Sequence, residues 1–511
     1  MISHKMTLLL GLDIGTTSLK AVLYDINSGL VTRVATRPTP VSHPRKGWSE
    51  HDPEALWQAV TTCIRESAGG QPVKGLAISS MAEAGLLLDA GGQALSPIIA
   101  WYDRRSEPQA ARIEEATSIE ALYRTTGQRA SPSFGLAKLL WIRDNLPEIF
   151  KRGKLWLPVP SYLLLRLVGK AAMDYTIAAR TLLFDQRTLN WSTTLLDLFD
   201  LPAALFPPAS PGGTPLGCLT AQAAAETGLP RSTVCVLGGH DHLCAALAAG
   251  AHAAGAMVDS TGSASALLLL TPRFLPNPAL ALRGYASYAY ILQDRYALKG
   301  GLKAAGSAIE WLARQLSAPG SEPDYPGLET AAAEGVARQA GPIWLPHLIG
   351  SGTPQGDRFS RAALVGMQFE HSHGDLFRGL LESLAFWNRH NLEEMQSLTG
   401  QPISSFTILG GVTRLRLLSQ LKADTLNRPV LVPQVPEAAA TGAALLAGLG
   451  AGTFNDPASA LSSLRYDCVQ IDPIIAHVSW YDALYRQVYL PLYSTLKPIN
   501  ETLHSFHPPD L

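Results

Sequence analysis

Cysteine is scarce in this sequence, and no cysteine motif is present. The five cysteines among 511 residues are odd in number and scattered, and no two of them form a Cys-x-x-Cys pair. This usage excludes a disulfide framework and a zinc ribbon, and it is typical of a reducing compartment. We therefore expect the protein to be cytoplasmic.

An excess of charge of either sign is also missing. Lys and Arg total 41 and Asp and Glu total 42, so the formal net charge is −1. A nucleic-acid-binding protein needs a basic stripe, and we therefore expect no nucleic-acid partner. A phosphorylated ligand is compatible with this balance, because backbone N–H groups bind phosphate without net positive charge.

No apolar run has the length of a membrane span. The first run, at 8–12, ends at Asp13 and is too short for a signal segment or a transmembrane helix. Hydrophobic residues make up 47% of the chain, which excludes a disordered chain and is enough for more than one core. We expect a globular protein with no membrane partner, and the sequence leaves a homodimer open.

The pattern of strands and turns is repeated in the two halves of the sequence. An apolar run at 7–12, a Gly/Thr turn and a second run at 19–25 predict a β-hairpin. The same order recurs at 255–270, where small polar residues and a glycine separate two apolar runs. Two such hairpins favour a duplicated α/β fold with mixed sheets and a cleft between the halves, which we place at 1–250 and 251–511.

The turn of the first hairpin has the composition of an anion site. Gly15, Thr16 and Thr17 bring backbone N–H groups and hydroxyls to one place. Lys20 adds a positive charge, and Asp13, at the end of an apolar strand, is an oxygen ligand suited to Mg²⁺. The spacing is not that of a Walker loop. The alternative is an ordinary tight hairpin with a surface aspartate.

A second candidate site follows the apolar residues Val236 and Leu237. A glycine pair leads there to Asp241, which lies between His240 and His242. Ligands of α/β proteins bind at the carboxyl ends of strands, where a carboxylate can accept a hydroxyl proton as a general base. The alternatives are a helix N-cap at Asp241 and a metal site formed by the two histidines.

A third motif begins with the glycine pair Gly410-Gly411, directly after the apolar run at 406–409. Glycine at a strand end lets a flat ring or a phosphate approach the backbone. An Ala- and Gly-rich helix follows Pro436-Glu437. On packing grounds alone, we interpret that helix as structural.

Taken together, these motifs resemble the FGGY carbohydrate kinases, a family within the superfamily of sugar kinases, actin and heat-shock-protein ATPases. The similar segments follow the family order and are 13–17, 47–53, 101–105, 138–141, 181–185, 239–241, 306–311 and 410–442. The resemblance implies two actin-like (ribonuclease H-like) ATPase domains, with mixed sheets flanked by helices, that close over ATP, Mg²⁺ and a sugar.

The resemblance also implies a role for each matching residue. Asp241 corresponds to the catalytic base and Asp13 to an acidic residue near the metal and the phosphates, so both are candidates to hold Mg²⁺. The residues implied at the nucleotide are Gly15, Thr16, Thr17, Lys20, Thr261, Gly262, Ser263, Gly306, Gly410, Gly411 and Thr413. Those implied around the sugar are Met81, Ala82, Glu83, Trp101, Asp103 and His242.

The sugar pocket departs from the pattern of xylulose kinases, the members most similar in length and layout. Ala82-Glu83 stands where those enzymes commonly have His-Gly, and His242 stands where they commonly have Asn. Val412 replaces the usual third glycine of the adenosine loop. We therefore predict that Ala82, Glu83 and His242 determine specificity.

The activity that the resemblance implies is transfer of the γ-phosphate of ATP to a primary hydroxyl of a ketose. D-xylulose, which would give D-xylulose 5-phosphate, is the first candidate. Kinases for ribulose, fuculose, gluconate, erythritol or another polyol are alternatives within the family. A non-catalytic sugar sensor and an actin-like structural ATPase are alternatives of other classes.

Overall fold

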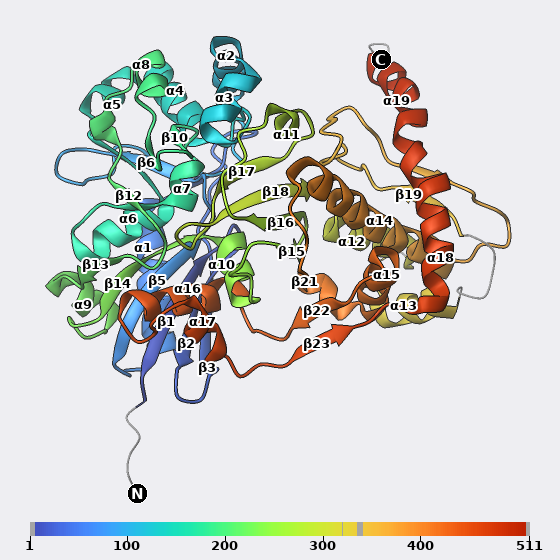
Figure 1. Cartoon of the computed structure of the whole chain (residues 1–511). Helices are drawn as coiled ribbons and strands as arrows, with labels where there is room; N and C mark the ends of the chain where they lie inside the picture. Colours follow the sequence, from blue (N-terminus) through green and yellow to red (C-terminus); the bar gives the residue numbers. More distant parts are fainter. Residues whose placement is uncertain (1–5, 319, 335–340, 507–511) are drawn as a thin grey trace, which may run out of the picture.

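Two large mixed β-sheets form the centre of the fold (Figure 1). The computed structural model describes residues 6–318, 320–334 and 341–506. The strands of the six-stranded first sheet are, in spatial order, β13 (Pro215–Cys218), β14 (Val234–His240), β5 (Val73–Ser80), β1 (Leu8–Ile14), β2 (Ser18–Asp25) and β3 (Leu30–Pro38). Those of the seven-stranded second sheet are β17 (Ala286–Ala289), β18 (Tyr296–Leu302), β16 (Ser265–Thr271), β15 (Ala256–Thr261), β21 (Ser405–Leu409), β22 (Val430–Pro433) and β23 (Cys468–Ile471).

The central connectivity of the two sheets is the same. In the first sheet β1, β2 and β3 form an antiparallel meander, and β5 and β14 continue it in parallel from β1. In the second sheet β15, β16 and β18 form the meander, and β21 and β22 continue it in parallel from β15. The predicted hairpins and the duplicated α/β architecture are therefore confirmed.

Smaller strands and a group of helices are inserted between β5 and β14. Three of these strands form a four-stranded sheet with β4, which precedes β5; its order is β4 (Glu50–His51), β7 (Ile98–Ile99), β6 (Gly85–Leu88) and β8 (Leu155–Pro158). Short two-stranded pairs in the same segment are β10 (Phe184–Asp185) with β11 (Asn190–Trp191) and β12 (Ala209–Ser210) with β9 (Met173–Asp174). A further pair, β19 (Ile343–Leu345) with β20 (Ala363–Val365), lies in the second half of the chain.

Helices cover both sheets and are the longest regular elements of the inserted segment. The helices before β15 are α1 (Pro53–Ala68), α2 (Glu107–Ala116), α3 (Ile119–Thr126), α4 (Gly135–Asn145), α5 (Pro147–Arg152), α6 (Val159–Val168), α7 (Tyr175–Ala179), α8 (Thr193–Leu198), α9 (Ala221–Thr227) and α10 (Asp241–Ala248). The later ones are α11 (Pro278–Leu282), α12 (Gly306–Leu316), α13 (Tyr325–Glu334), α14 (His373–Thr399), α15 (Arg416–Leu426), α16 (Ala438–Gly450), α17 (Pro457–Ser462), α18 (Ile475–Leu484) and α19 (Leu490–Ser505).

Local sequence signals account for where the principal helices begin. The side chain of Asp52 accepts a hydrogen bond from the N–H of Ala55 and caps α1, which has a proline in its first turn. Ser372 and Asp375 form a reciprocal capping box at the start of α14. Within the described residues no helix, α14 included, is long and apolar enough to cross a membrane.

Helix α16 lies late in the sequence but packs on the first sheet. It covers β1, β5 and β14 and also contacts α10. In Figure 1, α16 is the red helix that lies over the blue strands β1 and β5. A Cβ on Gly11 of β1 would lie 1.8 Å from the carbonyl oxygen of Ala440, and one on Gly442 would lie 1.9 Å from that of Cys244. Small residues therefore serve close packing here, as we predicted for this helix.

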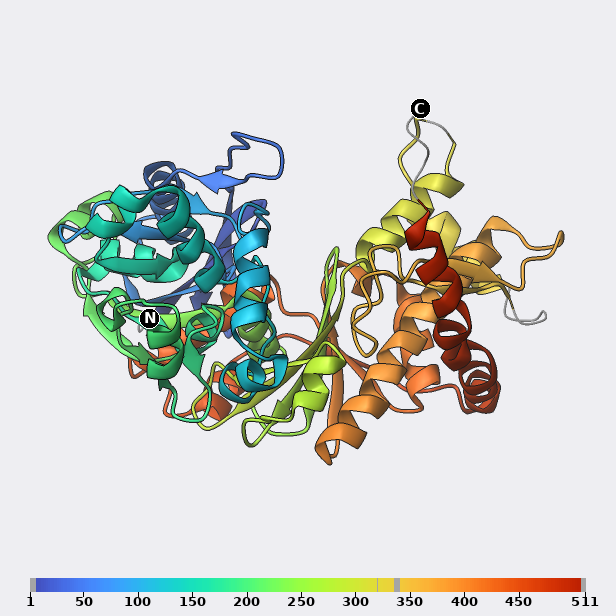
Figure 2. The ribbon, with the colours of Figure 1, turned by 90° about the horizontal axis from the view of Figure 1, so that it is seen from above.

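The chain forms two lobes that are connected through the centre (Figure 2). One buried apolar cluster includes residues of both sheets together with α10 and α16. The position 250, where we divide the sequence, falls between the end of α10 and the start of β15. Because α10 and α16 pack against each other between the sheets, the ends of the central strands of both sheets face a shared space.

Candidate active site

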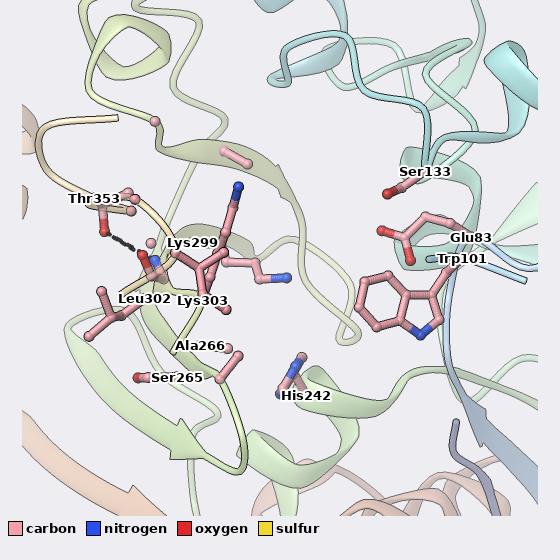
Figure 3. Close-up of a pocket in the computed structure, with 18 of the residues that line it drawn as sticks. Glu83, Trp101, Ser133, His242, Ser265, Ala266, Lys299, Leu302, Lys303 and Thr353 are labelled. Carbon is pink, nitrogen blue, oxygen red and sulfur yellow. Dashed lines mark hydrogen bonds between the residues drawn. The ribbon is translucent and has the colours of Figure 1, made fainter. Parts of the chain in front are cut away.

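A cavity of about 770 Å³ is lined by residues from both halves of the chain. The first half contributes Thr16, Met81, Ala82, Glu83, Trp101, Ser133, Arg180, His240, Asp241 and His242. The second half contributes residues of the segments 264–266, 284–286, 299–303 and 349–358. Figure 3 shows Glu83, Trp101 and Ser133 on one side and Lys299, Lys303 and Thr353 on the other.

Asp241 is the first residue of α10 and directly follows β14. Its side chain is 29% exposed and lines the cavity, and its Oδ1 accepts a hydrogen bond from the backbone N–H of His242 at 2.6 Å. The N-cap residue of α10 is His240, so Asp241 is not the helix cap. An accessible carboxylate at a strand end and a helix N-terminus can accept a proton from a bound hydroxyl.

The two histidines beside Asp241 are held neutral. Burial lowers the pKa of His240 well below its usual range and also lowers the pKa of His242. Nε2 of His240 lies 3.3 Å from Oδ1 of Asp241, and its backbone N–H donates to Oγ1 of Thr176 at 2.9 Å. No group of three or more His, Cys, Asp or Glu side chains suited to a metal ion occurs in the described ranges. The contacts of His240 with Asp241 and Thr176 hold the end of β14, and with it Asp241, in position.

Asp13 lies half-buried at the end of β1, close to Asp241. The hydroxyl of Ser79 on the adjacent strand β5 donates to its Oδ1 at 3.0 Å. Burial raises the pKa of Asp13 to about 7, and the negative charge of Asp241 contributes to the increase. A divalent cation would stabilise both charges, and carboxylate oxygens are ligands that Mg²⁺ accepts, so this pair fits the ion.

The turn of the first hairpin reaches the wall of the cavity through Thr16. Its Oγ1 accepts a hydrogen bond from Nε1 of Trp101 at 2.9 Å, and the indole ring, which is 39% exposed, lines the same cavity. Gly15 and Thr17 flank Thr16 in this turn. The aromatic ring predicted at the sugar therefore contacts the turn predicted at the phosphates.

Lys20, which the resemblance implies at the nucleotide, already has an acidic partner in the structure. Its Nζ lies 2.7 Å from Oε2 of Glu437, the residue just before α16. Both side chains are about one-third exposed, at 30% and 33%. Because Glu437 already neutralises Lys20, a phosphate would have to displace that carboxylate to bind it.

The glycine turns of the second half meet at one place. The N–H of Gly306, at the start of α12, donates to the carbonyl oxygen of Gly262 in the β15–β16 turn at 3.1 Å. Gly410 has a φ of 97°, and a Cβ there would lie 2.1 Å from the carbonyl oxygen of Thr261. The structure thus groups the second-half residues predicted at the nucleotide, which do not line the cavity itself: Thr261, Gly262, Ser263, Gly306, Gly410, Gly411 and Thr413.

Glu83 lines the cavity with its charge already paired. Its Oε1 accepts a hydrogen bond from Nε of Arg180 at 2.7 Å, and the two side chains are 10% and 12% exposed. Burial alone would raise the pKa of Glu83, but the positive charges of Arg180, Lys299 and Lys138 hold it below its usual value. The guanidinium also lies over the ring of Phe134. Glu83 therefore contributes to a rigid wall of the cavity.

Breaking this buried pair is expected to destabilise the fold. Glu83→Gln removes the negative charge and leaves the Arg180 guanidinium buried beside a neutral amide, so the free energy of unfolding should fall by about 3 kcal/mol. Chemical denaturation measures the change. Glu148→Gln, which removes one partner of the exposed pair with Lys151, is the control and should cost less than about 1 kcal/mol. Equal losses in the two variants would contradict this role for Glu83.

Asp103, which the resemblance implies near the sugar, does not itself line the cavity. Its carboxylate is buried and bound by the Arg105 side chain, at 2.9 Å from Nε, and by the backbone N–H of Ser49 at 2.6 Å. Arg105 lies in turn over the ring of Trp48, with 3.8 Å between Cζ and the ring centroid. All acceptor sites of Asp103 face these donors, and it therefore anchors the segment that carries Trp101.

Several residues of the cavity were not identified from the sequence. Arg180 directly precedes the family-like segment 181–185, which was the available signal. Lys299 and Lys303 interrupt a run of apolar and small residues in and after β18, and a charge in such a run is a detectable anomaly. The segment 349–358 has no motif and could not have been found.

Duplicated sheets with a shared cavity, a carboxylate pair and facing glycine turns define a two-domain phosphotransferase of the actin-like class. The chain belongs to the FGGY family of carbohydrate kinases, which are phosphotransferases with an alcohol group as acceptor. Residues 8–248 match the N-terminal domain of this family and residues 257–451 match its C-terminal domain.

Individual relatives include kinases with different substrates. A glycerol kinase from Methylibium petroleiphilum is 33% identical over 467 residues, which cover 88% of this chain and 92% of the relative. A xylulose kinase from Bacillus subtilis is 27% identical over 510 residues, covering 98% and 99% of the two chains. The structure of a xylulose kinase from Rhodospirillum rubrum has a TM-score of 0.89 at 31% identity, covering 97% of this chain and all of the other.

Proposed function

We propose that this ATP-dependent carbohydrate kinase transfers the γ-phosphoryl group of ATP to a primary hydroxyl of a small sugar. The observation that supports this reaction is the position of Asp241, an accessible carboxylate at the start of α10 that lines the cavity. The new bond joins the sugar oxygen to the γ-phosphorus, the bond to the leaving ADP oxygen breaks, and Asp241 accepts the hydroxyl proton.

The other residues bind and position the reactants. Asp13, with Asp241 beside it, would hold Mg²⁺, which neutralises charge on the phosphates when it is bound. Backbone N–H groups of the turns at Thr16 and Gly262 would bind the phosphates. The Trp101–Thr16 hydrogen bond ties the sugar wall to the first of these turns, so a sugar that packs on the ring would also hold the turn.

We propose D-xylulose as the first candidate substrate to test, because a xylulose kinase aligns with this chain along nearly its full length. Glycerol is the competing candidate, because glycerol kinases show similar or higher identity. The retained Asp241 argues against a non-catalytic sensor, which would need only the pocket.

A coupled assay of ADP release tests this function. Purified protein with ATP and Mg²⁺ is screened against ketoses, polyols, glycerol and sugar acids of three to six carbons. We expect sugar-dependent ADP release that is lost when EDTA removes the metal, and a phosphorylated product by mass spectrometry. Sugar binding by calorimetry without any ADP release would favour the sensor, and ADP release without a sugar requirement would favour a structural ATPase.

A further inference from the structure

Lys299 presents an unpartnered ammonium group to the cavity. It lies in β18, between the buried Leu298 and Gly300, and its side chain is directed toward the cavity, which it lines. Across the described segments 6–318, 320–334 and 341–506, its Nζ has no hydrogen bond or ion pair. Burial lowers the pKa of Lys299 to about 8, so it remains largely protonated at pH 7. Lys299 is half-buried, and a charge held without a partner in a cavity wall is available to an oppositely charged ligand.

The acidic groups of the cavity are already engaged. Glu83 is paired with Arg180. Asp357 accepts hydrogen bonds from the backbone N–H of Phe359 and from the hydroxyl of Tyr493. Asp241 is the group that we assign to the reacting hydroxyl.

A second lysine, Lys303, lines the same wall, opposite Glu83 and Trp101 (Figure 3). The formal net charge of the whole chain is only −1, so the two lysines are not part of a generally basic surface. The wall formed by Lys299 and Lys303 therefore carries local positive charge that no acidic residue of the cavity neutralises.

The position of Lys299 indicates the sugar side of the cavity. The charged groups that interact with it electrostatically are Arg180, Glu83 and Asp241. The glycine turns predicted at the nucleotide, such as those at Gly262 and Gly410, do not line this cavity. An oxyanion bound by Lys299 would therefore belong to the acceptor substrate rather than to ATP.

We propose that the acceptor substrate is a sugar acid, whose carboxylate is bound by Lys299 with Lys303 beside it while its terminal primary hydroxyl faces Asp241. This inference rests on the proposed kinase function and names the substrate class of the same site. A terminal phosphate of ATP offers the same oxyanion chemistry, so the experiment must separate these two sources.

Matched pairs of acceptors provide the test. Sugar acids of four to six carbons, such as D-xylonate, are compared with their uncharged amides, which keep the shape and lose the charge, and with D-xylulose. We expect kcat/KM for the preferred acid to exceed that for its amide by about 10- to 100-fold, the range of one charge-assisted hydrogen bond. In Lys299→Met this ratio should fall to near one, while the KM for ATP stays the same.

Control variants separate charge from structure. Lys299→Arg keeps the positive charge and should retain most of the preference for the acid. Lys74→Met removes a lysine from an exposed position of β5 and should change no kinetic constant. Lys299→Met should keep or raise the melting temperature, because it removes a half-buried charge that has no partner in the described residues. A lower melting temperature with an unchanged acid-to-amide ratio would assign Lys299 to the fold and overturn the proposal.

The kinetic outcomes distinguish the two proposals. Preferred turnover of D-xylulose or another neutral acceptor would overturn the sugar-acid inference and leave the kinase function intact. A rise in the KM for ATP that is equal for all acceptors in Lys299→Met would place the oxyanion on the nucleotide and also overturn it. ADP release with no acceptor of either charge would overturn the proposed function, and the inference with it.

Discussion

Asp241→Asn will lower kcat by about 10²- to 10⁴-fold, the usual contribution of a general base. Asparagine fills the same volume, and its Oδ1 can still accept the hydrogen bond that the N–H of His242 now donates at 2.6 Å. Its amide cannot accept the hydroxyl proton. Sugar and ATP dissociation constants, measured by calorimetry, should therefore change little while single-turnover phosphoryl transfer nearly stops.

A melting curve and a control variant make this result interpretable. Asp197→Asn neutralises an exposed aspartate in α8 that does not line the cavity, and it should keep normal turnover. If Asp241→Asn retains near-normal turnover with an unchanged melting temperature, Asp241 is not the base and the mechanism proposed above is incorrect.

The second large effect is expected from Gly262→Val in the β15–β16 turn. A Cβ at this position meets no atom within 4 Å, and its φ is outside the left-handed region, so the apoprotein can accept the side chain without strain. A branched side chain would occupy the space where a phosphate must approach the backbone. We expect the dissociation constant for ATP to rise by about tenfold or more, which is about 1.4 kcal/mol, at an unchanged melting temperature.

Two other glycines serve as comparisons for this variant. Gly341 also has open space around its Cβ position, and Gly341→Val should change neither ATP binding nor stability. A Cβ on Gly306 would lie 2.2 Å from the carbonyl oxygen of Gly262, so Gly306→Val should lower the melting temperature as well as ATP affinity. Unchanged ATP affinity in Gly262→Val would exclude this turn from the nucleotide site.

Features encoded by neighbouring residues could be predicted from the sequence. The hairpins around Gly15 and Gly262 depend on apolar runs interrupted by small turn residues, and α1 begins where Asp52-Pro53 provides a cap and a first-turn proline. The position of Asp241 could be predicted because an apolar strand that runs into a glycine pair brings the residues after it to a strand end. In these cases the physical cause lies within a few residues of the feature.

The partners of charged side chains were decided only by the tertiary structure. Lys20 is paired with Glu437 across 417 residues of sequence, and Glu83 with Arg180 across 97. The burial of Asp103 against Arg105 depends on how the inserted segment packs, and the lack of a partner for Lys299 among the described residues depends on how the second sheet packs. Local periodicity and turn composition determined the strands, the turns and the position of Asp241 at a strand end in this chain. Long-range packing determined which charges are neutralised and which remain available to a ligand, because Coulomb interactions depend on distance and burial rather than on order along the sequence.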